Sequence, residues 1–284
     1  MIRVVAPASS ANLGPGFDAA AAALDLWNEL TVEPSDELEV EVTGEGADEL
    51  PRDRTHLALR AFALVADVEG HRFRFVNRIP LERGLGSSAA AIALGLVAAG
   101  GDAGSDELLA AAAELEGHFD NLAAVLRGGV CLSWTRGGEP HAVRIASDLP
   151  LRPVLVVPAT RTNTAASRNG LPAEVSHSDA AETVASAALL GAAIASGSAA
   201  LLRDAFHDRL HEQYRSGDAP LLGLLRERLP AGAAGATLSG SGPSVVVWAE
   251  PEHADSVAAA IERIVPDDTT VLPLRVAQEG AHVT

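Results

Sequence analysis

Residues 80–90 combine the residue types that can hold a phosphate group. Gly84 and Gly86 let the backbone come close to an anion, and Ser87 and Ser88 add hydroxyl groups. The Ala-rich stretch that follows, residues 89–99, predicts a helix, whose first N–H groups and positive dipole end favour an anion. The segment therefore predicts a phosphate site, with a plain loop and a serine N-cap as the alternative.

Two further segments gather polar side chains that could complete such a site. Residues 7–18 are rich in turn formers and carry two serines, an asparagine and an aspartate, which predicts a polar loop. Residues 116–121 bring together a glutamate, a histidine, an aspartate and an asparagine. Oxygen ligands around a phosphate suit Mg²⁺, so Glu116 and the phosphate-segment serines could share one ion. The structural alternative is that Gly117 ends one helix and Asp120 caps the next.

The C-terminal half carries two segments with arginine and a second Gly/Ser-rich stretch. Residues 161–168 read as a Thr/Asn/Arg loop, and residues 208–215 lie at the end of a long predicted helix. Residues 235–244 alternate Gly and Ser ahead of a β-like run. Taken alone, such a stretch is a flexible turn more often than a ligand loop.

The elements that must position these segments follow from hydrophobic periodicity. Runs 24–32 and 38–42 alternate like strands paired with each other. The strands are expected at residues 3–5, 24–32, 38–42, 73–79, 129–133, 154–157 and 245–248. The helices are expected at residues 57–68, 89–99, 106–116, 178–196, 198–214 and 251–264. The proline-rich stretch 149–153 predicts a boundary between domains at 1–150 and 151–284, with a last strand at 271–276 that can return to the first domain.

Composition excludes several classes of protein. The chain has 284 residues, 48% of them hydrophobic, which is enough for one large core or two smaller ones. A net charge of −17 opposes binding to nucleic acid or to an anionic membrane. The chain has no run of 18 uncharged apolar residues and no apolar leader, so we expect a cytoplasmic protein with no membrane partner.

The counts of cysteine and lysine exclude further kinds of binding site. Cys131 is the only cysteine, which excludes intramolecular disulfides and cysteine-based zinc sites. All 21 basic residues are arginine, which removes the lysine of a Walker A loop and of a pyridoxal Schiff base. A bound nucleotide would therefore have its phosphates held by backbone N–H groups, arginine, serine and Mg²⁺.

Together these segments resemble the GHMP kinases, a family named for galactokinase, homoserine kinase, mevalonate kinase and phosphomevalonate kinase. The family carries an N-terminal Pro-x-Ser/Thr loop, then Pro-x3-Gly-Leu-Gly-Ser-Ser-Ala, then a Gly-rich loop. These motifs match residues 7–18, 80–90 and 235–244, in the same order. Residues 7–18 match the Pro-Ala-Ser-Ser-Ala-Asn-Leu-Gly-Pro-Gly-Phe-Asp pattern of homoserine kinases in full, and residues 116–121 match their Glu-Gly-His-Pro-Asp-Asn segment except at Phe119.

The resemblance implies a fold and an activity. The fold would be α+β, the two-domain GHMP kinase fold: an N-terminal domain like ribosomal protein S5 domain 2 and a ferredoxin-like C-terminal domain. The activity would be ATP-dependent phosphorylation of the side-chain hydroxyl of L-homoserine to O-phospho-L-homoserine, a step in threonine biosynthesis, with ATP and Mg²⁺ as cofactors. Homodimers are common in the family, so a homodimer is one expectation.

The resemblance also implies site residues. Arg168 and Arg215 would hold the substrate carboxylate, because a guanidinium binds a carboxylate bidentately. The residues expected at the substrate are Asn12, Asp18, His118, Asn121, Arg168 and Arg215. The residues expected at the nucleotide are Pro80, Leu81, Glu82, Arg83, Gly84, Leu85, Gly86, Ser87, Ser88, Ala89, Ala90, Ser239, Gly240, Ser241 and Gly242, with Ser88 and Glu116 at the metal. No residue stands out as a catalytic base.

The chain departs from the family pattern in three places, and alternatives stay open. Alanines occupy residues 19–23 in place of a Cys/x-Leu-Gly turn, His56 stands where an Asn usually lies near the adenine, and Phe119 replaces a proline. These changes leave two alternatives: a GHMP kinase for another small hydroxylated carboxylate, and a non-catalytic ligand-binding member of the fold. A dinucleotide-binding dehydrogenase is disfavoured because Ala89 occupies the last glycine position of its fingerprint.

Overall fold

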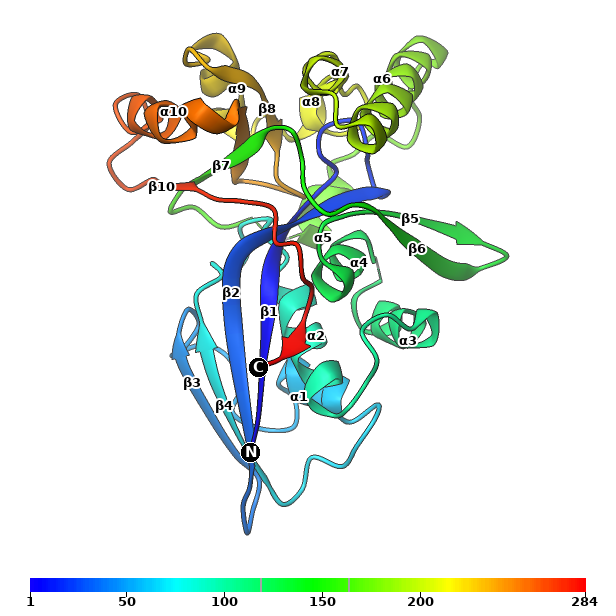
Figure 1. Cartoon of the computed structure of the whole chain (residues 1–284), viewed down its shortest axis with the longest axis vertical. Helices are drawn as coiled ribbons and strands as arrows, with labels where there is room; N and C mark the ends of the chain where they lie inside the picture. The colour runs from blue at the N-terminus through cyan, green and yellow to red at the C-terminus, as the bar shows by residue number, and fades with distance from the viewer. Residues whose placement is uncertain (118, 163) are drawn as a thin grey trace.

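The computed structural model describes residues 1–117, 119–162 and 164–284, and within them the chain forms two sheets with helices packed around each (Figure 1). The first sheet runs in the order β11-β1-β2-β4-β3, with β5 paired to β2 and β6 paired to β5. Its strands and helices are β1 (Ile2–Ala11), β2 (Ala20–Pro34), β3 (Glu39–Gly44), β4 (His71–Asn77), β5 (Val130–Arg136), β6 (Glu139–Ala146), β11 (His282–Val283), α1 (Leu57–Phe62), α2 (Ser87–Ala98), α3 (Asp106–Glu116) and α4 (Asp120–Arg127).

The second sheet is built from the C-terminal half, in the order β10-β7-β9-β8. In Figure 1 it lies above the first sheet, with α6, α7, α9 and α10 around it. Its elements are β7 (Arg152–Val157), β8 (Ala233–Leu238), β9 (Val245–Ala249), β10 (Thr270–Pro273), α5 (Thr164–Asn169), α6 (His177–Ser196), α7 (Ala199–Ala205), α8 (Glu212–Arg215), α9 (Pro220–Glu227), η1 (Pro251–His253) and α10 (Ala254–Ile261).

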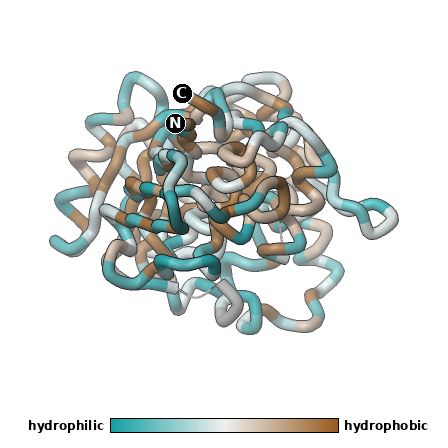
Figure 2. The backbone as a smooth tube through the Cα atoms, turned by 90° about the horizontal axis from the view of Figure 1, so that it is seen from below, coloured by the Kyte–Doolittle hydropathy of each residue, from teal (hydrophilic) through white to brown (hydrophobic). Residues whose placement is uncertain are grey.

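Hydrophobic side chains form two cores. The larger core lies between the first sheet and its helices and continues to Trp248 of β9, and the smaller one lies between the second sheet and helices α9 and α10. Seen from below, apolar segments run through the interior while hydrophilic segments occupy most of the periphery (Figure 2). Among the described residues, none of the helices is both long and apolar enough to cross a bilayer.

The alanine run is part of a strand that is buried on both faces. Residues 20–23 open β2, are fully buried, and pair with β1 on one side and β5 on the other. Helix α4 packs across the same strand, so only small side chains fit there. A Cβ atom added to Gly16 would lie 2.5 Å from the Cβ of Ala20. The alanines are therefore the size that close packing of this strand allows.

Strand β1 is longer than the sequence indicates. It continues through Ser9 and Ser10 to Ala11, so the loop predicted at residues 7–18 begins only after that point. Both serines are fully buried, and their hydroxyl groups bond to Asn121 and Ser239 from distant parts of the chain. These hydrogen bonds to distant residues offset the cost of burying two serine hydroxyl groups. They explain why two residues that usually favour turns lie in a strand here.

Three other expectations need correction. Strands β2 and β3 are not neighbours, because β4 lies between them and pairs in parallel with β3. The helix expected at 57–68 ends at Phe62. The helix expected at 198–214 breaks after Ala205, because the carboxylate of Asp208 accepts hydrogen bonds from the N–H groups of His211 and Glu212 and starts α8 anew.

The C-terminal segment divides between the two sheets. Strand β10 pairs with β7 in the second sheet, whereas Val276 forms a bridge with Leu24 of β2 and β11 pairs with β1. The return to the first sheet, expected at residues 271–276, is thus made by residues that follow β10. Figure 1 shows this red segment descending beside β1 to the chain end.

Candidate active site

One cavity between the two halves of the chain collects most of the predicted substrate residues. Its walls come from the end of β1, the β4–α2 turn, the α3–α4 junction, α5, α8 and the β8–β9 turn. The predicted substrate residues that line it are Asn12, Asp18, Asn121, Arg168 and Arg215. The sixth, His118, lies outside the described residues.

The β4–α2 turn presents a helix start that no side chain caps. Gly86 is the N-cap of α2, with φ 65° and ψ 30°, and it contributes no side-chain hydrogen bond to the first turn. A Cβ atom there would lie 2.0 Å from the Oγ of Ser9, so only glycine fits. The first N–H groups of this twelve-residue helix are therefore left for an anion at the wall of the cavity.

Hydrogen bonds hold the three motifs together around this turn. Ser239 Oγ donates to the carbonyl of Gly84 (2.7 Å), and Asn12 Nδ2 donates to the carbonyl of Gly240 (2.9 Å). A Cβ atom on Gly84 would lie 2.1 Å from the carbonyl oxygen of Ser239. The β4–α2 turn and the Gly/Ser-rich turn between β8 and β9 are therefore in close backbone contact, and a side-chain hydrogen bond from Ser239 joins them.

Two arginines from the C-terminal half differ in how their charge is compensated. Arg168 forms a bidentate pair with Asp18, at 2.9 and 2.8 Å, and this hydrogen bonding raises the pKa of Arg168. Arg215 is only 4% exposed and contacts two neutral acceptors, the Nδ1 atom of His211 (3.2 Å) and the carbonyl of Gly240 (3.3 Å). Its Nε atom has no hydrogen-bond partner within the described part of the chain.

Burial, and then the positive charge of Arg168, lower the pKa of Arg215. A buried cation whose direct contacts are neutral groups is costly unless an anion joins it. The phenyl ring of Phe17 packs near both guanidinium groups, at 5.8 Å from Arg168 and 5.5 Å from Arg215. The part of the cavity next to the two arginines therefore favours the binding of a small anionic group.

The two residues predicted for the metal, Ser88 and Glu116, lie in the wall of the same cavity, with Ser88 at the start of α2. Ser88 Oγ donates a hydrogen bond to Glu116 Oε1, and both residues line the cavity together with Asp120. Nearby, Ser9 Oγ donates to Asn121 Oδ1 (2.7 Å). A hydroxyl and a carboxylate in contact form a hard-oxygen donor set, which is the chemistry that Mg²⁺ prefers.

A second cavity opens on the other side of the α2 start. It encloses about 280 Å³ and shares Glu82, Ser87 and Ser88 with the first. The rest of its wall combines apolar residues (Leu50, Leu57, Phe75, Leu81, Ala91 and Leu94) with the polar residues Asn28, Glu49, His56, Asn77 and Arg161. The two cavities meet at the start of α2, whose first N–H groups suit an anion. A molecule with phosphates in its middle could therefore place one end in each cavity.

Not every residue of the predicted nucleotide set lines a cavity. The first cavity takes Glu82, Arg83, Gly84, Leu85, Gly86, Ser87, Ser88, Gly240 and Ser241, and Leu81 lines the second. Ala89 and Ala90 are fully buried in the core. Ser239 and Gly242 line neither cavity: Ser239 joins the two turns through Gly84, and the N–H of Gly242 donates to the carbonyl of Ser239 within its own turn. Pro80 is also outside both linings.

Sequence reasoning missed several residues that shape the site. Phe17 lies near both arginines, and His211 stacks on it at 5.0 Å while its Nε2 atom bonds to the carbonyl of Gly14. Both belong to segments that were singled out, but nothing in their local pattern indicates the stacking. The expected cap at Asp120 is also displaced, since Phe119 is the N-cap of α4 and Gly117 ends α3 as expected.

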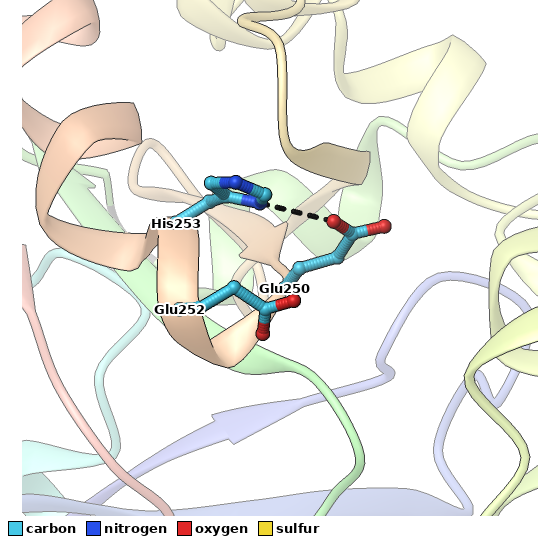
Figure 3. Close-up of side chains that lie close together, drawn as sticks. All are labelled: Glu250, Glu252 and His253. Atoms are coloured by element: carbon cyan, nitrogen blue, oxygen red, sulfur yellow. Dashed lines mark hydrogen bonds and ion pairs between the residues drawn. The ribbon is translucent and has the colours of Figure 1, made fainter.

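Among the described residues, one other group has side-chain atoms close enough to hold a metal. Glu250, Glu252 and His253 lie together on the surface at η1, with His253 Nδ1 bonded to Glu250 (Figure 3). Glu250 is also paired with Arg203, at 3.0 Å. This is an exposed ion-pair network, and it lines neither cavity.

Family models match both halves of the chain. The model of the GHMP kinases N terminal domain matches residues 54–129, which include the phosphate turn and α2, and that of the GHMP kinases C terminal domain matches residues 190–267. The chain belongs to the GHMP kinase family. The two-domain fold implied by the resemblance is thereby confirmed for this GHMP kinase.

Relatives of this GHMP kinase match it over nearly its full length. The homoserine kinase of Streptomyces coelicolor is 42% identical, covering 98% of this chain and 96% of its own. That of Carboxydothermus hydrogenoformans is 43% identical, covering 92% and 89%. The structure of homoserine kinase from Cytophaga hutchinsonii superposes with a TM-score of 0.86 at 27% identity, covering 100% and 97%.

Proposed function

We propose that the protein transfers the γ-phosphoryl group of ATP to the side-chain hydroxyl of L-homoserine, a step toward threonine. The observation that carries the proposal is Arg215, a buried guanidinium in the wall of the cavity whose contacts are neutral groups. A substrate carboxylate would supply the missing anion. The names of the relatives point to the same amino acid.

The two arginines would have different roles in binding the amino acid. Arg215 would take the carboxylate, and Arg168 would join it as its pair with Asp18 opens. Asp18 would then be left to accept a hydrogen bond from the substrate's ammonium group or its hydroxyl. Asn121, which Ser9 holds in place, lies between these residues and the phosphate turn as part of the same cavity wall and would orient the hydroxyl.

The phosphates of ATP would bind at the start of α2, with the nucleoside in the second cavity. In transfer, the substrate oxygen forms a bond to the γ-phosphorus, and the bond to the bridging oxygen breaks. That oxygen keeps the electron pair and leaves as part of ADP, while the hydroxyl proton passes to solvent. Positioning and neutralisation of charge can account for most of such a reaction, so no strong base is required.

Ser88 and Glu116 would hold Mg²⁺, because their oxygens already meet at the phosphate side of the cavity. When bound, the ion neutralises phosphate charge. The variant Glu116→Gln keeps the size of the side chain and removes its charge. We expect it to need more Mg²⁺ for half-maximal activity, as measured by a magnesium titration of initial rate. A lower melting temperature with the same magnesium dependence would show a purely structural glutamate.

The test is ADP release in Mg²⁺-ATP with L-homoserine, D-homoserine, L-serine and mevalonate, followed by phosphorus NMR of the product. We expect selective turnover of L-homoserine and a phosphate ester on its side chain. Turnover of mevalonate alone would replace this substrate by another hydroxylated carboxylate. Homoserine binding without ADP release would indicate a ligand-binding protein that has lost catalysis.

A further inference from the structure

His211 links two segments that line the first cavity, the loop after β1 and helix α8. Its Nε2 atom lies 2.8 Å from the carbonyl oxygen of Gly14, and its Nδ1 atom lies 3.2 Å from Nη1 of Arg215. The ring also stacks on Phe17, with centroids 5.0 Å apart and an interplanar angle of 22°. The residue is fully buried, so these contacts are its whole polar environment apart from Asp208, whose carboxylate lies 3.8 Å from Nε2.

The two close contacts determine which ring nitrogen carries the proton. A carbonyl oxygen can only accept, so Nε2 is the N–H donor toward Gly14. In the neutral imidazole Nδ1 then keeps its lone pair and accepts from Arg215, whose guanidinium can only donate. A proton on both nitrogens would place two N–H groups, one on each side chain, against each other. Nδ1 is therefore an acceptor that is directed at the arginine.

The start of α8 does not require this imidazole. His211 is the N-cap of the helix, but its side chain makes no capping hydrogen bond. The carboxylate of Asp208 accepts instead from the backbone N–H groups of His211 and Glu212, each at 2.8 Å. The ring is thus available for contacts outside the helix start.

The side-chain hydrogen bonds of Arg215 to the described residues leave from one of its three guanidinium nitrogens. Nη1 carries two N–H groups and has two acceptors, Nδ1 of His211 and the carbonyl of Gly240, at 3.2 and 3.3 Å. Nε has no hydrogen-bond partner within the described part of the chain. In the planar group one N–H of Nη2 is parallel to that of Nε, and this pair forms a fork that matches a carboxylate. Since Arg215 lines the first cavity, a carboxylate bound there can meet this fork.

We propose that His211 is a positioning residue for the substrate: by accepting from Nη1, it fixes the orientation of the Arg215 guanidinium and leaves the Nε–Nη2 fork for the substrate carboxylate. The inference rests on the proposed function for the identity of that carboxylate, and it assigns a role to a side chain that would not touch the substrate. Without the acceptor the guanidinium would turn more freely, and binding would have to immobilise it, which lowers affinity.

The experiment compares two ligands that differ only at the carboxylate. Calorimetry measures the binding of L-homoserine and of L-homoserinol, in which a neutral hydroxymethyl group replaces the carboxylate, without ATP. The proteins are the wild type, His211→Asn and His211→Leu. The two substituted side chains have nearly the same branched shape, and both lose the ring, its stacking on Phe17 and the contact to Gly14. Asparagine alone places an acceptor, Oδ1, near the position of Nδ1.

The informative quantity is the ratio of the two affinities. We expect the wild type to prefer L-homoserine, His211→Asn to retain most of this preference, and His211→Leu to lose about tenfold of it, the size expected for one lost buried hydrogen bond. In an Arg215→Ala background, His211→Leu should leave the ratio unchanged, because the histidine acts through the arginine. A damaged fold would weaken both ligands together without changing their ratio.

The same ratio in the wild type and His211→Leu would overturn the proposal, as would equal binding of both ligands by the wild type. An equal loss in His211→Asn and His211→Leu would also overturn it, because the effect would then belong to the ring or to the Gly14 contact. If His211→Leu does not fold, His211→Phe takes its place, since phenylalanine keeps a ring but has no acceptor. The assay involves no phosphoryl transfer, so a protein with the expected ratios that does not phosphorylate homoserine would refute the proposed function alone.

Discussion

The two cavities share the first turn of α2 but differ in the side chains that line them. The first is lined by ionised and amide side chains that are held in place by hydrogen bonds across three motifs. The second is lined by a larger share of aliphatic and aromatic side chains, together with polar residues that include the buried His56, Asn28 and Asn77. Charge interactions in a buried setting are steep functions of position, whereas apolar burial changes gradually with area.

This difference implies different sensitivities to substitution. Removing one charged partner in the first cavity should cost much of the selectivity for the amino acid and leave nucleotide binding nearly intact. Removing one apolar side chain in the second should weaken the nucleotide slightly and leave the amino acid unaffected. The four changes below probe that contrast in order of expected effect.

Arg215→Ala should give the largest loss. The guanidinium is buried, and its proposed partner is a carboxylate that would be desolvated on binding. Truncating one member of such a pair costs about 2–4 kcal/mol, roughly 30- to 1,000-fold in kcat/KM for homoserine. Steady-state kinetics with each substrate varied in turn would measure it, with KM for ATP expected to change little.

The matched control is Arg203→Ala, which removes an arginine of the same half of the chain that is half exposed and paired with Glu250 outside both cavities. Its kinetics should equal those of the wild type. If Arg215→Ala also left kcat/KM unchanged, the buried cation would not be part of the substrate site, and the contrast between the cavities would fail.

His56 gives a second large effect, on stability as a function of pH. Its pKa is about 4 in the folded protein, below the 6.5 of an unburied histidine, so the unfolded state binds more protons between these values. The contribution of the buried neutral ring is fully present above pH 6.5 and is lost as the pH falls toward 4. The shift corresponds to about 3 kcal/mol.

Urea unfolding of the wild type and His56→Phe at several values between pH 7.5 and 4 would measure this contribution. Carboxylates titrate in both proteins, so the informative quantity is the difference between their unfolding free energies. That difference should fall with decreasing pH below about 6.5. A difference that stays constant would mean that the imidazole is accessible to water and titrates normally.

The sequence predicts a helix after the Gly-rich segment because this signal is local. Glycines followed by an alanine-rich stretch indicate a helix start wherever the rest of the chain lies, and α2 begins at Ser87, two residues before the expected start at residue 89. By contrast, the hydrogen bonds of the buried Arg215 guanidinium go to His211 and to the carbonyl of Gly240, and no local pattern indicates these partners. Arginines alone do not reveal which of them is paired.

The sequence also does not show which residues are buried by contacts with distant parts of the chain. Ser9 and Ser10 resemble a turn because the partners of their hydroxyls, Asn121 and Ser239, are far away in the sequence. The second cavity draws on separate segments around Leu50, His56 and Phe75, and no local pattern joins them. Where the driving contacts are between distant residues, periodicity and turn chemistry predict the wrong element boundary.

Arg168→Ala should have a smaller effect than Arg215→Ala. Its side chain is 45% exposed and already paired with Asp18, so water compensates part of its loss. We expect kcat/KM for homoserine to fall by about 5- to 30-fold, equivalent to about 1–2 kcal/mol. Kinetics of both arginine variants in one series would show the order, and a larger loss in Arg168→Ala would assign the carboxylate to the outer arginine.

The smallest change is expected for Leu57→Ala, which tests the apolar cavity. Leu57 begins α1 directly after His56, and its side chain lines the wall of the second cavity. Shortening it removes a small part of the contact with the base, worth about 1 kcal/mol or roughly fivefold in KM for ATP. Homoserine should keep its KM, since the cavity proposed for it is the first one, which Leu57 does not line. The control is Leu64→Ala, a half-exposed leucine just beyond the same helix. A loss of homoserine affinity in Leu57→Ala would show that the two cavities are energetically coupled, and their separate physics would then no longer predict separate specificities.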